Sequence, residues 1–409
     1  MLQNKTHSTS SLKKILIIGG GPAGMMAAIE LSKTHEVHVF EKGKTLGRKF
    51  LVAGKGGFNL SNSATEKSLF EKYSPQNFLE PILKKFDSTA TVKWLKYLGI
   101  PTYVGSSGRI FPEKGIKPIE VLNALKNKML AQKVQLHFEH EFIDFNKEQI
   151  HFIHQQKKMS IPFETCIFAL GGASWSVTGS KGDWLTSFEK NAIQTIPFEA
   201  SNCGIICTSL QKEFLEQFEG FPLKNITITC NNKLVKGEAL ISTYGLEGNA
   251  IYPISAEVRK NLHKNSSTSV FIDLKPFNSA EELQQKITAT TKPKNYKYLF
   301  NLNKVQLALI KNFSSKEHYM NPTSFVELLK KLEIPISGLR PMEEAISTVG
   351  GIALEELNLD LSLKKIPNIY IAGEMFDWDT QTGGYLLQAC FATGYHVAQN
   401  ILARSTKNF

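Results

Sequence analysis

The feature that most constrains the fold of this chain is a short apolar strand that runs directly into a glycine-rich turn. Residues 15–18 are aliphatic, residues 19–24 read Gly-Gly-Gly-Pro-Ala-Gly, and an Ala- and Met-rich helical segment follows. In such a unit Gly19 permits the tight turn, Gly21 lets a pyrophosphate approach the backbone, and Gly24 lets the helix pack on the strand. The helix N-terminus adds the positive end of its dipole. The pattern therefore predicts a dinucleotide-binding βαβ unit.

A second predicted strand supports this interpretation. It covers residues 36–40 and ends at Glu41, seventeen positions after Gly24. A carboxylate at this place suits the two hydroxyls of an adenosine ribose and repels a 2′-phosphate, so the sequence favours FAD or NAD over NADP. The alternative is a glycine-rich turn without a ligand.

Length and hydropathy indicate how many domains the chain can form and whether it crosses a membrane. At 409 residues the chain is long enough for two or three domains. It has no apolar run of the roughly 20 residues that cross a bilayer, and residues 1–11 are polar rather than a signal-peptide core. We therefore expect a cytoplasmic protein that does not enter the membrane, either a monomer or a homodimer.

Cysteine spacing and net charge limit the redox chemistry and the binding partners that this chain is expected to have. The five cysteines (Cys166, Cys203, Cys207, Cys230 and Cys390) contain no C-x-x-C pair, which indicates reduced thiols and argues against dithiol chemistry. The net charge of +11 is compatible with nucleic acid or anionic ligands, but scattered lysine pairs favour an ordinary solvated surface. The richest basic patch lies at residues 292–297.

Later segments predict further elements around a sheet edge. Residues 43–62 hold too many glycines for a helix or a strand and read as a functional loop. Helices are predicted over residues 81–98 and 118–131, and a strand over 134–145. A strand at residues 166–170 delivers Gly171 and Gly172 to the carboxyl edge, where ligands of such sheets bind.

The C-terminal part supplies a second strong signal. Short β-like runs begin near residue 196, helix-period residues occupy 279–332, and a final strand at 369–372 leads into Gly373 and Glu374. Glu374 and Asp377 suit ribityl hydroxyls, and the helix that begins near Gly383 suits the negative charge of a reduced flavin. An ordinary βα turn with acidic capping residues is the alternative.

Together these segments resemble the BaiN-like family of bacterial NAD(P)/FAD-dependent oxidoreductase flavoproteins, within the glutathione-reductase-like FAD superfamily. The matching motifs are residues 19–24 with Glu41, 47–49, 53–62, 108–112, 170–183, 243–248 and 373–388. The resemblance implies an α/β fold with a discontinuous Rossmann-like FAD-binding domain over residues 1–195 and 343–409. It also implies a β-rich second domain over 196–278 and 333–342 and a small helical insert over 279–332.

The resemblance further implies non-covalent FAD and a set of contacts to it. With Gly19, the cofactor-binding residues carried over by motif are Gly21, Ala23, Gly24, Glu41, Lys42, Arg48, Lys49, Gly54, Gly172, Gly373, Glu374, Asp377, Gly384 and Tyr385. One departure is plain, because Gly57 and Phe58 stand where many relatives carry Arg and Cys. Our hypothesis is that Lys55 supplies the missing positive charge.

The candidate catalytic residues are Trp175, Tyr244 and Arg109, since each lies in a motif expected at the carboxyl edge. An aromatic ring could stack on the flavin and a phenol could relay a proton. Core packing, or an ion pair for Arg109, is the alternative for each of them. The sequence shows no metal-ligand spacing among its histidines and no nucleophile elbow, and we expect no metal.

Three functions are compatible with these motifs. The leading one is an FAD-dependent oxidoreductase that transfers hydride through FAD and reduces a small organic substrate with NAD(P)H. No second G-x-G-x-x-G lies between Gly172 and Gly373, so NAD(P)H is expected as a transient co-substrate. The first alternative is an oxidase of amines or amino ketones that uses oxygen. The third is an RNA-binding flavoprotein, and we rank a nucleic-acid partner below a small molecule because no known RNA module is recognisable.

Overall fold

The computed structural model describes residues 13–52, 57–105 and 107–407. The chain divides into two compact units. Met1–Glu199 and Val349–Phe409 form the first, here called the Rossmann unit, and Ala200–Thr348 form the second unit. The chain passes from one unit to the other twice, and we call these two points the crossings. They lie within β12 (Thr195–Ser201) and β20 (Ser347–Ile352), which pair as a two-stranded sheet.

A five-stranded parallel sheet is the centre of the Rossmann unit. Its order is β21 (Ile369–Ile371), β11 (Thr165–Phe168), β1 (Lys14–Ile18), β2 (Glu36–Phe40) and β7 (Gln135–His137). The last residue of β1 pairs with Phe40 on one side and Phe168 on the other. Four successive residues of β1 are buried, as expected for a strand covered on both faces. The strand ends therefore meet at one carboxyl edge.

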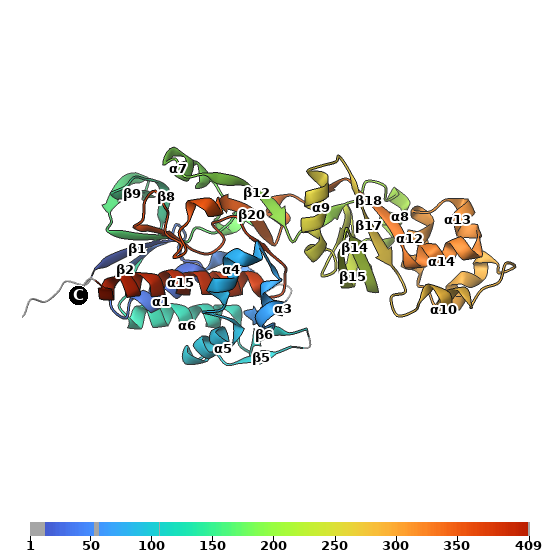
Figure 1. The fold of residues 1–409 in the computed structure, drawn as a ribbon, viewed down its shortest axis with the longest axis horizontal. Helices are drawn as coiled ribbons and strands as arrows, with labels where there is room; N and C mark the ends of the chain where they lie inside the picture. The colour runs from blue at the N-terminus through green and yellow to red at the C-terminus, as the bar shows by residue number, and fades with distance from the viewer. Residues whose placement is uncertain (1–12, 53–56, 106, 408–409) are drawn as a thin grey trace, which may run out of the picture. The chain divides into compact units, whose positions relative to one another are not determined.

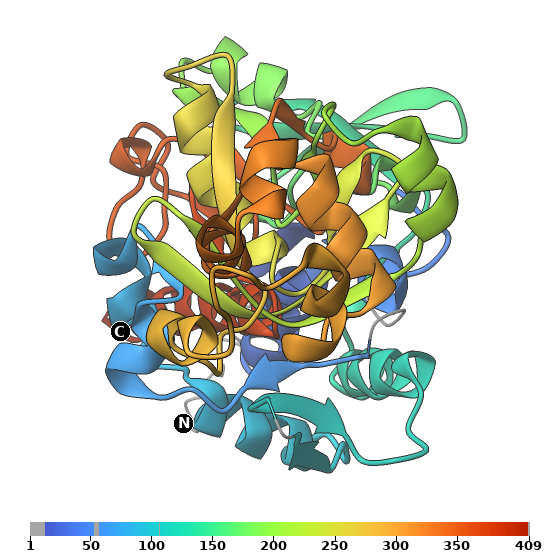
Figure 2. The same cartoon turned by 90° about the vertical axis from the view of Figure 1, so that its right-hand side faces the viewer.

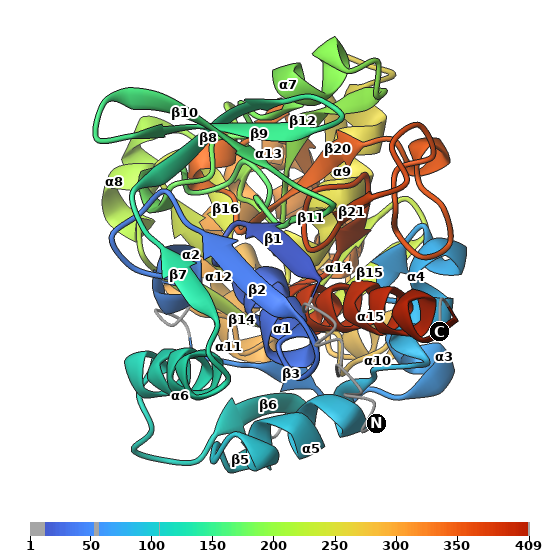
Figure 3. The same cartoon turned by 90° about the vertical axis from the view of Figure 1, so that its left-hand side faces the viewer.

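Helices and a small antiparallel sheet cover the two faces. The helices α1 (Pro22–Leu31) and α15 (Tyr385–Lys407) lie side by side on one face, and β8 (His140–Phe145), β9 (Gln149–His154) and β10 (Lys157–Pro162) lie on the other (Figures 1 and 3). Aromatic contacts pack the antiparallel sheet against the parallel sheet. The ring centroids of Phe40 and Phe152 lie 4.8 Å apart, and those of Phe142 and Phe168 lie 5.1 Å apart.

The remaining elements of this unit frame the sheet edge. The helices are α2 (Arg48–Val52), α3 (Glu66–Phe70), α4 (Gln76–Leu83), α5 (Ser88–Tyr97), α6 (Pro118–Ala131) and α7 (Leu185–Lys190). A three-stranded sheet joins β3 (Ser61–Asn62), β6 (Arg109–Pro112) and β5 (Thr102–Val104), and β4 (Tyr73–Ser74) pairs with β22 (Asp379–Thr380). The predicted helix at 118–131 matches α6 at both ends.

Three sequence predictions in this unit are corrected. The stretch 43–62 is not loop throughout, because α2 and β3 lie within it. The single helix predicted over 81–98 is two, since the Asp87 side chain accepts a hydrogen bond from the Ala90 N–H and begins α5. The strand predicted over 134–145 breaks into β7 and β8 at Glu139, whose φ of 59° no regular strand accommodates.

The second unit is built on an antiparallel sheet of seven strands in its described residues. The order is β18 (Leu332–Ile336), β17 (Thr268–Asp273), β14 (Pro222–Cys230), β15 (Lys233–Ser242), β16 (Gly245–Glu247), β13 (Ile205–Ile206) and β19 (Gly338–Leu339). The helices are α8 (Lys212–Phe218), α9 (Ser255–Leu262), α10 (Ala280–Gln284), α11 (Tyr296–Leu299), α12 (Lys304–Asn312), α13 (Lys316–Met320) and α14 (Pro322–Lys330).

The helices between Ala280 and Lys330 lie together on one side of this sheet (Figure 2). They share its apolar core, in which Ile228 of β14 belongs to the same buried cluster as Tyr296 and Phe325 of the helices. The division into a β-rich domain and a separate helical insert therefore stays a prediction.

Several absences hold for the part of the chain that the structure describes. None of its helices combines the length and the apolar character that a bilayer crossing requires. It contains no group of three or more His, Cys, Asp or Glu side chains placed to hold a metal ion. Its five cysteines are free thiols, four of them buried.

Candidate functional site

The glycine turn between β1 and α1 is shaped by two different constraints. A Cβ at Gly19 would lie 2.3 Å from the Ala169 carbonyl oxygen, and one at Gly24 would lie 2.1 Å from the Gly19 carbonyl oxygen. Real side chains do not fit at such distances, so both positions require glycine. A Cβ at Gly21, in contrast, meets no protein atom within 4 Å. The backbone at Gly21 therefore borders open space.

The N-terminus of α1 faces this space with unpaired backbone donors. Pro22 occupies the first turn, no side chain caps the helix at Gly21, and the first intrahelical bond runs from the Met25 N–H to the Gly21 carbonyl over 2.9 Å. The N–H groups of Ala23 and Gly24 thus precede the hydrogen-bonded ladder. Together with the helix dipole they suit a pyrophosphate.

Glu41 is held rigidly at the end of β2. Its carboxylate accepts hydrogen bonds from the Gly20 N–H at 3.0 Å and the Gly43 N–H at 2.8 Å. Each oxygen therefore has one fixed donor and keeps capacity for another. This arrangement suits the two hydroxyls of a ribose.

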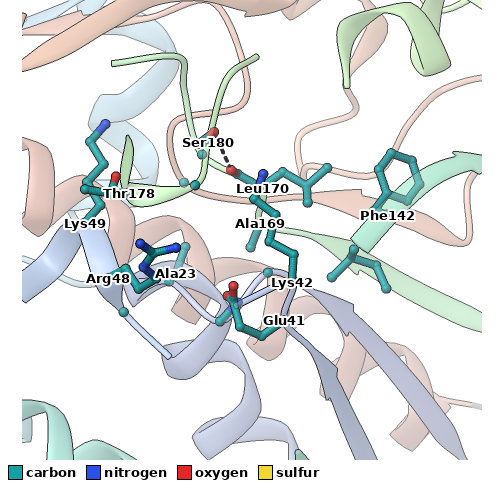
Figure 4. Close-up of a pocket in the computed structure, with 18 of the residues that line it drawn as sticks. Ala23, Glu41, Lys42, Arg48, Lys49, Phe142, Ala169, Leu170, Thr178 and Ser180 are labelled. Atoms are coloured by element: carbon teal, nitrogen blue, oxygen red, sulfur yellow. Dashed lines mark hydrogen bonds between the residues drawn. The ribbon is translucent and has the colours of Figure 1, made fainter. Parts of the chain in front are cut away.

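A cavity opens at this carboxyl edge, and Figure 4 shows lining residues that follow β1, β2 and β11 around it, such as Ala23, Glu41 and Leu170. The sequence-predicted residues that line it are Gly19, Gly21, Ala23, Glu41, Lys42, Arg48, Lys49, Gly373 and Glu374. They come from the first βα turn, from the segment that contains α2, and from the loop after β21. Segments more than 300 residues apart in the sequence therefore meet at one cavity, as a discontinuous domain requires.

An ion pair crosses the cavity wall. The Lys49 ammonium donates to Ser174 Oγ at 2.6 Å and to Glu374 Oε2 at 3.0 Å, and the Glu374 side chain is buried. Arg48 donates from Nη2 to the Val177 carbonyl at 3.2 Å. These bonds connect α2 to the loop after β11 and to the loop after β21. Glu374 offsets the charge of Lys49, whereas Lys42 and Arg48 line the cavity without an ion-pair partner among the described residues and suit a phosphate-bearing ligand.

The N-terminus of α15 rests against β3 and β6. A Cβ at Gly384 would lie 2.2 Å from the Ser61 carbonyl oxygen, and Asn62 Nδ2 donates to the Gly383 carbonyl at 3.0 Å. The Arg109 side chain lies beside Gly383 and Tyr385. Tyr73 donates its hydroxyl to the Tyr385 carbonyl at 2.8 Å. This end of the helix is therefore fixed by backbone packing.

The remaining predicted cofactor residues lie outside the cavity lining. Gly24 and Gly384 act in close backbone packing, the Gly172 carbonyl accepts from Ser180 Oγ, and Asp377 Oδ1 accepts from the Gly350 N–H at 3.1 Å. Tyr385 is the first residue of α15 and contributes its carbonyl to Tyr73. Gly54 and Lys55 fall outside the described residues, and so do the predictions made for them.

The three catalytic candidates lie on separate elements. Trp175 has a left-handed backbone (φ 56°) and precedes the short 3-10 helix Ser176–Thr178, whereas Arg109 belongs to β6. Tyr244 belongs to the second unit, where its hydroxyl donates to Glu247 and the Arg340 guanidinium lies 4.1 Å from its ring centroid. Burial, and then the Glu247 carboxylate, raise the pKa of Tyr244, which keeps its phenol protonated at neutral pH.

Sequence reasoning missed part of the lining. His140 and Phe142 enter from β8, and Thr178, Ser180 and Cys390 from the loop after β11 and from α15. Ser180 Oγ donates to the Leu170 carbonyl at 2.9 Å. Burial raises the pKa of Cys390 to about 12, so the thiol is protonated. Ser180 lay in a motif used for the family resemblance, but no sequence signal places β8 over this edge.

A parallel sheet with a glycine turn, an open helix N-terminus and a carboxylate at the end of the second strand defines a Rossmann-type dinucleotide-binding protein. The cavity fits FAD, because its lining contains the open Gly21, the cations Lys42 and Arg48, and the glycine and glutamate that follow β21. The chain belongs to the HI0933-like family, since residues 13–400 match the HI0933-like protein Rossmann domain.

Curated relatives match nearly the whole chain. A 3-dehydro-bile acid delta(4,6)-reductase of Clostridium scindens is 24% identical over 94% of this chain and 98% of its own length. A ribosomal RNA dihydrouridine synthase of Haemophilus influenzae is 26% identical over 96% of this chain and 99% of its own. The open conformation of a flavocytochrome c3 fumarate reductase matches with a TM-score of 0.50 and 13% identity, over 97% of this chain and 79% of that one. This last likeness shows the fold alone.

These findings confirm the predicted family resemblance and the Rossmann-like α/β fold. The protein is an FAD-dependent oxidoreductase. Its substrate and its electron donor are proposed below.

Proposed function

We propose that this protein is an NAD(P)H-linked reductase that saturates a carbon–carbon double bond conjugated to a carbonyl group. The support is chemical. The names of the two curated relatives describe reduction of steroid double bonds and formation of dihydrouridine. Both reactions remove a C=C bond beside a carbonyl, although one product is a steroid and the other a nucleoside in RNA. The shared bond type, rather than either whole substrate, is what we assign to this chain.

The observation that carries the proposal is the cavity at the sheet edge. In our proposal Gly19, Gly21, Ala23 and Gly24 receive the FAD pyrophosphate and Glu41 receives the adenosine ribose. The other proposed contacts are Lys42, Arg48, Lys49, Gly54, Gly172, Gly373, Glu374, Asp377, Gly384 and Tyr385. FAD, when bound, supplies the capacity to accept a hydride and to return it.

NAD(P)H is proposed as a transient donor. No second G-x-G-x-x-G lies between Gly172 and Gly373, so the sequence offers no dedicated second dinucleotide turn. The overall reaction takes a hydride from NAD(P)H and a proton from solvent or a protein acid, and it places one hydrogen on each carbon of the double bond. Tyr244 was the candidate from the sequence, but its raised pKa and its hydrogen bond to Glu247 disfavour transfer of its proton, so we propose solvent as the proton source.

RNA uridine is a second candidate substrate beside a small organic molecule. Residues 284–316 contain seven lysines and neither Asp nor Glu, which is a long stretch of uncompensated positive charge. A polyanionic substrate would explain it. The alternative function as an oxidase of amines draws no support from either curated relative.

An anaerobic titration tests the proposal. NADPH or NADH should bleach the visible flavin band of the purified holoenzyme, and a conjugated dienone or a uridine-containing RNA should then restore it without oxygen. Bleaching by an amine, with peroxide released on aeration, would contradict the reductase. A band that no nicotinamide nucleotide changes would contradict the proposed electron donor.

A further inference from the structure

The second unit contains a polar cavity that the reductase site does not use. It lies between the N-terminus of α12, the loop that follows β17 and the bulged part of β14. Its lining includes Lys224 and Lys275 and the side-chain amides of five Asn and Gln residues, and none of its lining residues is acidic. A cavity with cations and amide donors but no carboxylate selects for an anion.

Gln306 gives this cavity an amide donor from a largely buried side chain. The residue is 6% exposed, lines the cavity, and accepts the Asn303 N–H through Oε1 at 3.1 Å. A backbone N–H needs an acceptor, which fixes the oxygen on that side and leaves Nε2 as the other end of the amide. Within the described residues Gln306 Nε2 donates to no protein atom. This nitrogen is not one of the fully enclosed polar atoms that lack a partner, so it is accessible from the cavity and free to donate to a ligand or to water.

The helix N-terminus adds to the same cavity. Asn303 is the N-cap of the nine-residue helix α12 and accepts the Gln306 N–H at 2.8 Å. The next two backbone donors, of Lys304 and Val305, have no intrahelical acceptor. Since both Asn303 and Gln306 line the cavity, it lies at the positive end of the helix dipole.

The charges around the cavity are mostly uncompensated. Lys275 donates from Nζ to the Asn301 carbonyl at 2.7 Å, and its pKa is lowered by burial and then by Lys286. The nearby Asp273 is neutralised by Lys330, whose Nζ lies 2.6 Å from its carboxylate. In the described chain Lys224 has no ion-pair partner. A negative charge would therefore be stabilised here.

An aromatic ring stands beside these donors. Phe277 belongs to the cavity lining, yet 81% of its surface is exposed. It lies in a tight turn in which the Asn278 N–H donates to the Lys275 carbonyl at 3.1 Å. Phosphate-binding groups next to an exposed aromatic face are the combination that holds single-stranded nucleic acid, in which cations track the backbone and rings stack on bases.

We propose that this cavity binds a phosphate of single-stranded RNA and that Phe277 stacks on an adjoining base. The inference rests on the proposed function in one respect, the choice of RNA uridine as substrate. The second unit would then bind the RNA strand. Two further lysines lie close by, because Lys304 begins α12 and the charge of Lys286 acts on Lys275.

Fluorescence anisotropy of the oxidised holoenzyme with a labelled oligouridylate of about 12 nucleotides tests this site. Gln306→Glu keeps the side-chain shape and the acceptor for Asn303 but places a carboxylate in the cavity, and binding should weaken at least about tenfold. Lys224→Gln should lower the salt dependence, d log K/d log[salt], by about 0.7. Phe277→Leu should weaken binding about fivefold or more, and Phe277→Trp should restore it.

Lys264→Gln, at an exposed lysine outside the cavity, is the matched control for charge. Flavin content and NADPH bleaching, measured in the same variants, should not change. Equal RNA binding by wild type and Gln306→Glu would overturn the site. Binding of NADPH or inorganic phosphate that depends on Gln306, without RNA binding, would overturn the choice of RNA. Failure of NADPH and NADH to bleach the flavin, with RNA binding that still depends on Gln306, would refute the proposed electron donor and leave the RNA site standing.

Discussion

At the scale of single residues, the glycines of the first turn separate folding from ligand binding. Gly24 is required by the protein itself, because a Cβ there would collide with the Gly19 carbonyl. Gly21 has an ordinary φ of −80° and open space where its side chain would be. Nothing in the protein therefore demands glycine at Gly21, whereas a ligand pressed against the backbone would.

Gly21→Val should accordingly fold as well as wild type and bind no FAD. The valine side chain would fill the space next to the first turn of α1, where we propose the pyrophosphate. The measurement is visible flavin absorbance per mole of purified protein, together with urea unfolding of the apoproteins. Stoichiometric flavin in this variant would contradict the proposed pyrophosphate position.

Gly24→Ala is the matched control. It should lower the stability of the apoprotein, whereas Gly21→Val should prevent FAD binding. Its Cβ would lie 2.1 Å from the Gly19 carbonyl oxygen, so β1 and α1 must move apart. Such overpacking costs about 1–3 kcal/mol. The apoprotein should unfold at lower urea than the Gly21→Val apoprotein, and equal midpoints would contradict the packing argument.

At the scale of elements, the paired edge of β2 and β7 carries a short imidazole chain. His38 Nε2 lies 2.8 Å from Glu36 Oε1, and His38 Nδ1 lies 3.0 Å from His137 Nε2. The His137 ring also stacks on Phe40, with centroids 4.4 Å apart. Burial, followed by the charges of His38, His140 and Lys14, lowers the pKa of His137 to about 4.

Acid should therefore destabilise this edge in a defined window. Between about pH 6.5 and 4 the unfolded chain binds a proton at His137 that the folded chain does not bind, so the free energy of unfolding falls as the pH falls. His137→Phe should flatten this fall, as measured by urea unfolding across that range. His318→Phe, at an exposed position of α13, should not. A pH dependence that His137→Phe leaves unchanged would refute the assignment.

Gln388 connects three elements around the start of α15. It is fully buried, accepts hydrogen bonds from Ser61 Oγ at 2.5 Å and Thr91 Oγ1 at 2.8 Å, and donates to the Phe86 carbonyl at 2.9 Å. Gln388→Met would leave these three groups unpaired and should cost about 3 kcal/mol or more of unfolding free energy.

Thr91→Val provides the comparison for Gln388. It removes one donor and leaves the amide bonded to Ser61 and Phe86, so it should cost only about 1 kcal/mol. Denaturant unfolding measures both variants. Similar losses in the two would show that the amide does not act as the common partner.

The elements also show how far sequence reasoning extends. The turn at residues 19–24, Glu41 and the strand before Gly373 were predictable because each is a local pattern with a local physical cause. The short helix α2 was missed because its glycine-rich surroundings outweighed five helical residues. His140 and Phe142 reach the cavity because β8 packs over the parallel sheet. That contact depends on tertiary packing, which no window of sequence reports.

At the scale of the whole molecule, each of the two units has its own large buried apolar cluster. Every residue that lines the proposed FAD cavity belongs to the Rossmann unit, and every residue that lines the proposed RNA site belongs to the second unit. Cofactor binding and strand binding should therefore be separable by cutting the chain at the two crossings. These crossings lie in β12 and β20, which pair with each other, so their ends are close enough for a short linker.

A chain in which a Gly-Ser linker joins Glu199 to Val349 should purify yellow, because it keeps the glycine turn, Glu41 and the Lys49–Glu374 ion pair. The excised segment Ala200–Thr348 should be colourless, should unfold cooperatively around its own apolar cluster, and should bind oligouridylate in a manner sensitive to Gln306→Glu. Flavin absorbance, urea unfolding and anisotropy measure the three properties. A linker-joined Rossmann unit that unfolds cooperatively but holds no flavin would show that its cavity is insufficient for FAD, because folding alone could not then explain the loss.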